Sequence, residues 1–309
     1  MLLIVRPKEK RHLVRELASH GTVSTEIGES IFRIRRKEPD TELGYCFADC
    51  IWSNVRELGF ESITDAQRLL RAISRKWQYY GDRLYRRGAL IAEPLEIKHS
   101  KNPLHFPNKP ADFTLKTHAF TLASENTLYW SDTFSKPTVD GMLEFTESKY
   151  PPSRAYLKLW EALYILGDYP KPGEQTIDLG SSPGSWTWVI ASLGARVQSV
   201  DRATLNERVA KLPGVAFESA DAFKIPVRKI DWLFSDLICY PEKLYEFVVP
   251  WLTQGACQKF ICTLKFKGEP DFDIIRRFQS LPHSSVIHLN HNKNEATWIC
   301  HPQLNSKQI

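Results

Sequence analysis

Apolar runs that end beside acidic residues alternate with helical segments in the second half of the chain, and this alternation most constrains the fold. The runs 174–179, 195–200 and 230–235 finish beside Asp178, Asp201 and Asp236. Short strands separated by helices are typical of a largely parallel α/β sheet. The expected strands are 174–179, 195–200, 215–217, 230–235, 259–266, 285–289 and 296–300, and the expected helices are 186–193, 244–251 and 272–279.

The first half of the chain is less regular. Its pattern predicts a β-α-β-β opening, a connector rich in proline and asparagine, and a later strand pair. The expected boundary lies near residue 148, which gives a smaller α+β domain over 1–147 and the α/β domain over 148–309. The expected elements of the first domain are strand 2–5, helix 8–19, strands 22–27 and 30–35, helix 65–80, connector 104–112 and strand pair 113–130.

Composition sets broad limits on the function. A length of 309 residues fits two domains, since a domain has roughly 150 residues. The net charge of +5 permits a nucleic-acid partner without requiring one. None of the six cysteines forms a C-x-x-C pair, so neither zinc nor a disulfide framework is expected. No apolar run reaches the length of a membrane span, and the apolar start is too short for a secretory signal, which predicts a cytoplasmic protein.

The segment Asp178–Trp186, with the sequence DLGSSPGSW, lies between an expected strand and an expected helix. Its glycines have the spacing G-x-x-x-G, which differs from the G-x-G-x-x-G of dinucleotide folds. A carboxylate at Asp201 can accept hydrogen bonds from both hydroxyls of a ribose, and Asp221 could face an adenine amino group. The pattern favours S-adenosylmethionine binding over an ordinary tight turn. The candidate cofactor-binding residues are Asp178, Gly180, Ser182, Pro183, Gly184, Ser185, Trp186, Asp201, Asp221 and Asp236.

Five short segments together resemble the FtsJ class of RNA 2′-O-methyltransferases, and within it the RlmM type, which modifies a cytidine of large-subunit ribosomal RNA. The resemblance covers about residues 140–302, roughly half of the chain. It implies a Rossmann-like methyltransferase domain with a Lys-Asp-Lys-Glu tetrad at Lys158, Asp236, Lys265 and Glu295. The segments that carry it are 153–159, the glycine turn, 235–237, 263–265 and 294–297.

The tetrad suits the chemistry that the resemblance implies. A ribose 2′-hydroxyl is a poor nucleophile, and a lysine can remove its proton only when neutral, so the pKa of the base must be lowered. We expect Lys265 to be the base, with Lys267 as the alternative, and Lys158 to orient the hydroxyl or stabilise the developing alkoxide. Asp236 would hold Lys265, and Glu295 would position Lys158 or the ribose. Alone, Lys158, Asp236 and Glu295 would each also fit an ordinary surface or capping role. Lys265 fits one less well, because it ends a strongly apolar strand where a charge is costly.

This chain departs from the family at two places. The family has a third glycine where this chain has Ser185, which could crowd the methionine carboxylate of the cofactor. The stretch FKGEPDFD after Lys265 is also unlike the family's, and that stretch often contacts RNA, so the resemblance does not fix the substrate.

The first domain resembles the ferredoxin-like element and THUMP RNA-binding domain of the RlmM type, shortened by several dozen residues. One stretch carries seven basic residues against the single acid Asp82. Four aromatic residues are interleaved with them, namely Trp77, Tyr79, Tyr80 and Tyr85. This mixture fits RNA binding and fits equally a solvated amphipathic helix whose aromatic side chains enter the core. The basic residues are Arg68, Arg71, Arg75, Lys76, Arg83, Arg86 and Arg87.

The sequence therefore predicts a methyltransferase that uses S-adenosylmethionine and acts on a ribose 2′-hydroxyl of RNA. Ribosomal RNA is the favoured substrate and transfer RNA the alternative. Two further possibilities stay open: an RNA-docking protein that retains the cofactor fold without turnover, and a methyltransferase for a small molecule or a protein.

Overall fold

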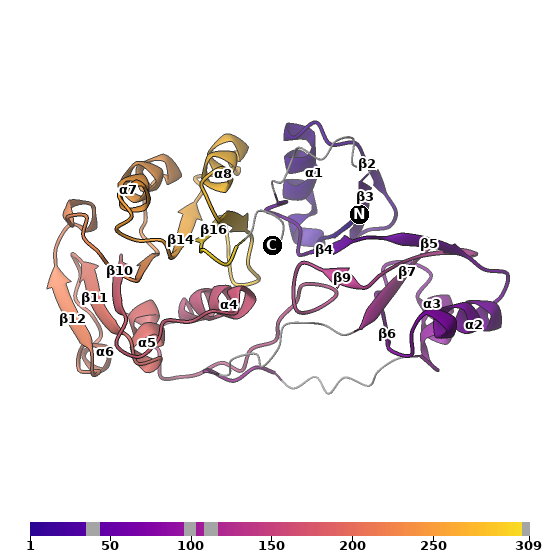
Figure 1. The fold of residues 1–309 in the computed structure, drawn as a ribbon, viewed down its shortest axis with the longest axis horizontal. Coiled ribbons are helices and arrows are strands. Elements are labelled where there is room, and N and C mark those ends of the chain that lie inside the picture. The colour runs from indigo at the N-terminus through magenta and orange to yellow at the C-terminus, as the bar shows by residue number, and fades with distance from the viewer. Residues whose placement is uncertain (35–43, 96–102, 108–116, 305–309) are drawn as a thin grey trace. The chain divides into compact units, whose positions relative to one another are not determined.

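The computed structural model describes residues 1–34, 44–95, 103–107 and 117–304. Its contacts divide the chain into two compact units, each of which is described by itself (Figure 1). The first unit comprises Met1–Thr41, Phe47–Asn102 and Asp112–Leu143, and the second comprises Glu42–Cys46, Pro103–Ala111 and Glu144–Ile309.

The second unit contains a seven-stranded sheet in the order β12-β11-β10-β13-β14-β16-β15. The first five strands in this order are parallel, while β16 runs antiparallel to both of its neighbours. Every strand expected in this half of the chain is present. The bounds are β10 Gln175–Leu179, β11 Arg196–Asp201, β12 Val215–Ser219, β13 Trp232–Ser235, β14 Phe260–Lys265, β15 Ser284–Ile287 and β16 Glu295–Cys300.

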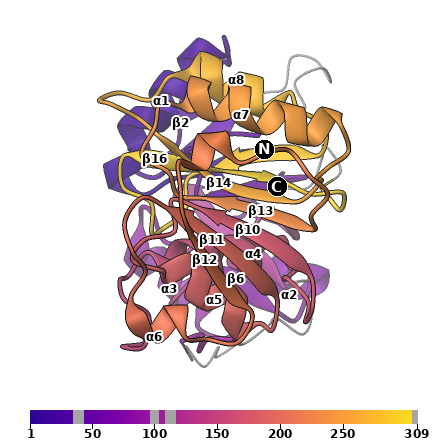
Figure 2. The same cartoon turned by 90° about the vertical axis from the view of Figure 1, so that its left-hand side faces the viewer.

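Helices cover both faces of this sheet, as expected for a Rossmann-like domain. Figure 2 shows α7 and α8 on one face and α5 and α6 on the other. The three expected helices are present as α5, α7 and α8. The helix α4 had no expected bounds, because it is buried almost all round and so lacks the one-sided apolar pattern of a surface helix. The bounds are α4 Tyr156–Leu166, α5 Ser185–Ser192, α6 Glu207–Ala210, α7 Pro241–Thr253 and α8 Phe272–Gln279, with the short helix η2 at Ala222–Lys224.

The first unit contains two sheets. The five-stranded sheet has the order β2-β3-β1-β4-β9, and the four-stranded sheet has the order β5-β8-β7-β6. The expected β-α-β-β opening is confirmed as β1, α1, β2 and β3. The bounds are β1 Leu2–Ile4, η1 Pro7–Glu9, α1 Lys10–Ser19, β2 Ser24–Glu26, β3 Ile31–Ile34, β4 Cys50–Ser53, β5 Arg56–Gly59, α2 Ile63–Ile73, β6 Trp77–Tyr79, α3 Tyr85–Ala92, β7 His118–Ser124, β8 Thr127–Ser131 and β9 Thr133–Phe134.

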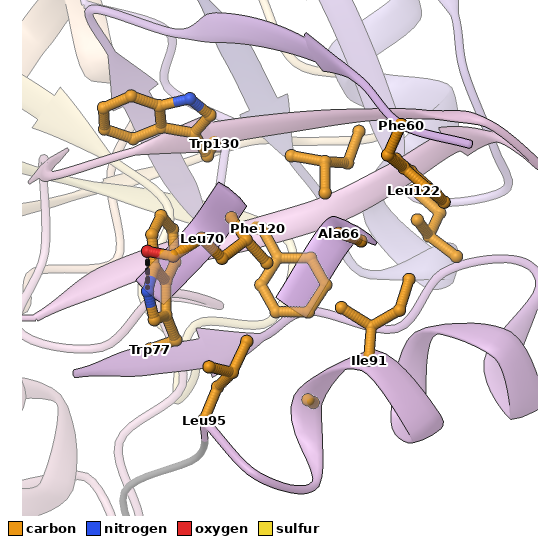
Figure 3. Close-up of a cluster of buried hydrophobic side chains, with 11 residues drawn as sticks. Phe60, Ala66, Leu70, Trp77, Ile91, Leu95, Phe120, Leu122 and Trp130 are labelled. Atoms are coloured by element: carbon orange, nitrogen blue, oxygen red, sulfur yellow. Dashed lines mark hydrogen bonds between the residues drawn. The ribbon is translucent and has the colours of Figure 1, made fainter. Parts of the chain in front are cut away.

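The helix expected over 65–80 is wrong in its second half. Helix α2 ends at Ile73, Ser74 is extended, and strand β6 follows and pairs in parallel with β7. Trp77 of this strand is fully buried, and its indole N–H donates to the carbonyl of Leu70 (Figure 3). Tertiary packing of this side chain thus overrides the helical spacing of the local sequence.

Parts of two other expectations lie outside the described residues, namely 108–112 of the connector and 113–116 of the strand pair. The rest of the strand pair is present as β7 and β8, which pair antiparallel. Within the described residues, no helix is long and apolar enough to cross a membrane.

Candidate active site

The strand order of the seven-stranded sheet changes direction at β10, which has β11 on one side and β13 on the other. Ligands of such sheets bind at this switch point, beyond the carboxyl ends of the strands. The glycine turn lies there, directly after β10. Gly180 has φ +74°, and a Cβ atom on it would come within 3.0 Å of the backbone of Leu237. Gly184 has φ +112° and ends the turn at the start of α5.

The carboxylate of Asp201, at the end of β11, stabilises this turn through a hydrogen bond to its backbone. One of its oxygens accepts the backbone N–H of Ser182 at 3.0 Å, and the other accepts that of Ala203 at 2.9 Å. The hydroxyl of Ser182 donates to the carbonyl of Thr204 at 2.9 Å, and Pro183 is exposed. Each carboxylate oxygen can accept more than one hydrogen bond, so these contacts leave Asp201 able to bind ribose hydroxyls.

Asp221 lies two residues beyond the end of β12 and caps the short helix η2. Its carboxylate accepts the backbone N–H of Phe223 at 3.1 Å and forms an ion pair with Arg202 at 2.7 Å. The hydrogen bond from Phe223 and then the guanidinium of Arg202 lower the pKa of Asp221. The carboxylate is therefore ionised and can accept a hydrogen bond from an amino group.

Two buried oxygens near the turn have no hydrogen-bond partner among the described residues. They are Oδ1 of Asp178 and the hydroxyl of Ser181. The other carboxylate oxygen of Asp178 accepts the hydroxyl of Thr187 at 2.6 Å, and burial raises the pKa of Asp178 to about 7. A bound molecule with hydrogen-bond donors would satisfy these oxygens, so the turn fits the polar end of S-adenosylmethionine.

Ser185 and Trp186 are buried in the first turn of α5, and their polar atoms meet the segment that precedes α4. The hydroxyl of Ser185 lies 2.8 Å from that of Ser153. The indole N–H of Trp186 donates to the carbonyl of Ala155 at 2.9 Å. The hydroxyl at position 185 thus makes its hydrogen bonds to Ser153.

The four tetrad residues come from four elements and meet in one closed ring. Lys158 lies in α4, Asp236 directly follows β13, Lys265 ends β14, and Glu295 begins β16. The antiparallel register of β14 and β16 places Lys265 opposite Glu295. Lys158 Nζ lies 2.8 Å from Asp236 and 3.0 Å from Glu295. Lys265 Nζ lies 2.7 Å from Asp236 and 3.0 Å from Glu295.

Charges alternate around this ring, and each ion is bound by two opposite ions. Burial raises the pKa of Asp236 and of Glu295, but the two lysines outweigh burial and hold both values below the ordinary range. Burial lowers the pKa of Lys265, but Asp236 and Glu295 outweigh it and raise that pKa above its ordinary value. The lowered pKa expected for Lys265 is therefore wrong for the ring as it stands, because the sequence did not show that two carboxylates would face one lysine.

The two candidate bases differ in their surroundings. Strand β14 ends at Lys265, so the strand alternation that would place Lys267 on the same face does not continue. Lys267 is exposed, whereas 23 % of the Lys265 side chain and 10 % of the Lys158 side chain are exposed.

A buried carboxylate that sequence reasoning missed supports the ring. Glu161 follows Lys158 by three residues on α4 and is fully buried. Its carboxylate accepts the backbone N–H of Asn290 at 2.8 Å and lies 2.7 Å from Nδ1 of His291. These contacts fix the turn that leads into Glu295. The spacing of three residues on one helix face was the available signal, because it places Glu161 beside Lys158.

The basic stretch of the first unit is largely exposed. Arg68 pairs with Asp65, and Arg83 and Arg87 donate to backbone carbonyls. Trp77 belongs to the core, Tyr79 and Tyr80 are half-buried, and only Tyr85 is exposed among the four interleaved aromatic residues. Within this described stretch, four of the seven basic side chains make no ion pair or hydrogen bond, namely Arg71, Arg75, Lys76 and Arg86.

A cavity in the second unit lies away from this site. It opens at the amino ends of β10, β11 and β12, and Gln175, Arg196 and Val215 are among its lining residues. The tetrad and the glycine turn lie at the carboxyl ends, so this cavity has no part in the site.

Residues 151–273 match the FtsJ-like methyltransferase family. This part of the chain is an FtsJ-like methyltransferase domain. S-adenosylmethionine is the cofactor of such domains. The matched range includes the glycine turn and three residues of the ring. The fourth, Glu295, lies beyond the matched range.

Curated relatives of the FtsJ-like domain carry the name ribosomal RNA large subunit methyltransferase M. The one from Halorhodospira halophila is 35 % identical over 130 residues, which cover 41 % of this chain and 38 % of the relative. The one from Xanthomonas euvesicatoria is 34 % identical over 161 residues, which cover 47 % and 46 %. The chain thus spans less than half the length of these relatives. A solved structure from Plasmodium falciparum, provisionally named a ribosomal RNA methyltransferase, is 17 % identical over 50 % of this chain and 98 % of that one, with a TM-score of 0.37.

Proposed function

We propose that this chain is an S-adenosylmethionine-dependent RNA 2′-O-methyltransferase that acts on large-subunit ribosomal RNA in the cytoplasm. The observation that carries the proposal is the closed ring of Lys158, Asp236, Lys265 and Glu295 beside the glycine turn. A domain that only docks onto RNA has no chemical need for two lysines held there. The names of the curated relatives favour large-subunit ribosomal RNA. The resemblance of the sequence to the RlmM type favours cytidine as the nucleotide.

The residues around the glycine turn would hold the cofactor, which supplies an electrophilic methyl group on a positively charged sulfur. Gly180 and Gly184 let the backbone approach it closely. Asp178 and Ser181 offer buried oxygens to its donors, and Asp201 offers acceptors to its ribose hydroxyls.

The ring must change its protonation before it can act as a base. Lys265 carries a proton while Asp236 and Glu295 both face it, so it must first release that proton to water before it can accept another from a 2′-hydroxyl. The positively charged sulfur of S-adenosylmethionine would add a positive charge beside the ring. That charge would lower the pKa of Lys265, because like charges repel each other. Lys265 then takes the proton of the hydroxyl, and Lys158, still charged, stabilises the oxygen that becomes negative.

We propose that the first unit holds the RNA through its exposed basic stretch. Six of the seven basic side chains are exposed, and phosphate neutralisation needs accessible cations. A shortened THUMP-like arrangement would fit this role. Base stacking contributes less than the sequence pattern indicated, since Trp77 lies in the core.

The proposal is tested by methyl transfer from labelled S-adenosylmethionine to total RNA from cells that lack this protein. We expect label on a ribose 2′-oxygen of large-subunit RNA, lost by about 10²- to 10⁴-fold in Lys265→Ala and retained in Lys267→Ala. Label on transfer RNA would redirect the substrate assignment. A protein that binds the cofactor and labels no RNA would instead be a docking module or a methyltransferase for another substrate.

A further inference from the structure

The hydroxyl of Ser185 joins the glycine turn to the segment that leads into α4. Its oxygen accepts the backbone N–H of Ser153 at 3.0 Å, and it lies 3.1 Å from the carbonyl of Ser153. The two serine hydroxyls are 2.8 Å apart. Ser185 is 3 % exposed, so water does not compete for these contacts.

Ser153 in turn holds the beginning of α4. Its hydroxyl accepts the backbone N–H of Ala155 at 3.3 Å. The carbonyl of Ala155 accepts two donors, the indole N–H of Trp186 at 2.9 Å and the backbone N–H of Lys158 at 3.2 Å. Hydrogen bonds therefore connect Ser185, the first residue of α5, with Lys158 of α4.

We propose that the Ser153–Ser185 hydrogen bonds set the position of Lys158 relative to the glycine turn, which makes both serines positioning residues for methyl transfer. This inference rests on the proposed function. Methyl transfer depends on the alignment of the attacking oxygen with the methyl group, and small displacements of the groups that align them cost rate. A residue without a hydroxyl at position 185 could not make these contacts, so the link between α5 and the start of α4 depends on the serine side chain.

The test separates positioning from binding. We expect Ser185→Ala to lower kcat about tenfold while the affinity and stoichiometry of S-adenosylmethionine binding, measured by calorimetry, change less than about twofold. Ser153→Ala removes the contact between the two hydroxyls and the one to the Ala155 N–H, but keeps the backbone N–H and carbonyl that bond Ser185, so it should lower kcat less. The double variant should lose less than the sum of the two single effects, because the contact between the hydroxyls is lost in both. Ser185→Gly, which also removes the hydroxyl, gives a second measurement if the alanine variant folds poorly.

Ser192→Ala is the matched control, because Ser192 is an exposed serine at the far end of α5. It should leave both kcat and cofactor affinity unchanged. An unchanged kcat in Ser185→Ala would overturn the inference, and so would a loss of binding stoichiometry equal to the loss of rate, which indicates a purely structural role.

A second measurement distinguishes failure of this inference from failure of the proposed function. If the unaltered protein transfers no methyl group to RNA, the proposed function fails. Hydrogen exchange of residues 153–160 then decides the inference by itself. We expect Ser185→Ala to lower protection of these amides and to leave that of β10 unchanged, and equal protection in both proteins would overturn the proposal.

Discussion

At the scale of single residues, the charges of the ring determine when Lys265 can act. Its two carboxylate neighbours raise its pKa above the ordinary 10.5, so the neutral form is scarce at neutral pH and increases tenfold with each pH unit. We therefore expect kcat to rise about tenfold per unit through the neutral range, with bound cofactor shifting the curve to lower pH. A pH–rate profile at saturating substrates measures this, and a flat profile from pH 6 upward would rule out Lys265 as the base.

Asp178 is a second residue whose protonation has a measurable effect. Its pKa is about 7 in the folded chain because it is buried, against 3.8 as the ordinary value. Between these two values the folded chain binds more protons than the unfolded chain, so stability falls as pH rises, and the loss is complete above pH 7. We expect Asp178→Asn to remove about 3 kcal/mol of this decline between pH 5 and pH 8. Urea unfolding at the two pH values tests it, and an unchanged difference would contradict the buried carboxyl.

The sequence was enough to name the residues of the ring, but it was not enough to predict the direction of their pKa shifts. The motif order named all four ring members, since each lies at a strand end or in a short recognisable segment. The direction of the Lys265 pKa shift depends on which carboxylates face the lysine in space, and no sequence spacing shows that. Glu161 escaped notice for the same reason, because its partners at Asn290 and His291 are distant in sequence.

At the scale of elements, the strands of the second unit were predictable because each is a short apolar run bounded by turn residues. The first unit was harder to predict. The stretch after Ile73 has helical spacing, yet Trp77 enters a core built by residues from β7 and β8. That contact joins segments far apart in the sequence, so local pattern alone does not show it.

The backbone of the glycine turn passes close to another segment at Gly180. Gly180 and Gly173 both have positive φ, but a Cβ atom would meet Leu237 at 3.0 Å at Gly180 and nothing within 4 Å at Gly173. Both alanine variants should lose about 1 kcal/mol from backbone strain. Gly180→Ala should in addition displace Leu237, the residue after Asp236, and weaken cofactor binding at least about tenfold. Calorimetry and urea unfolding of both variants check this, and equal cofactor affinities would show that the close approach at Gly180 has no role in binding.

At the scale of the whole molecule, the basic stretch belongs to the first unit and the ring to the second. RNA affinity and methyl transfer should therefore be separable. Replacing Arg71, Arg75, Lys76 and Arg86 by alanine removes four exposed cations without breaking an ion pair within the described residues. We expect weaker RNA binding and a raised KM, with kcat and cofactor affinity unchanged, because these residues bind substrate before the reaction and not during it.

The salt dependence of RNA binding shows whether the weaker binding of this variant comes from lost phosphate contacts. Each phosphate contact removed lowers the slope of log K against log salt by about 0.7 to 0.9. The four-residue variant should therefore lose up to about 3 to 4 units of slope, measured by RNA binding between low and physiological salt. A variant that removes the exposed lysines 171, 211, 224 and 229 from the second unit has the same net charge and should retain more of the slope. Equal losses of slope in the two variants would show that RNA binding depends only on the net charge of the protein. The first unit would then have no specific part in binding.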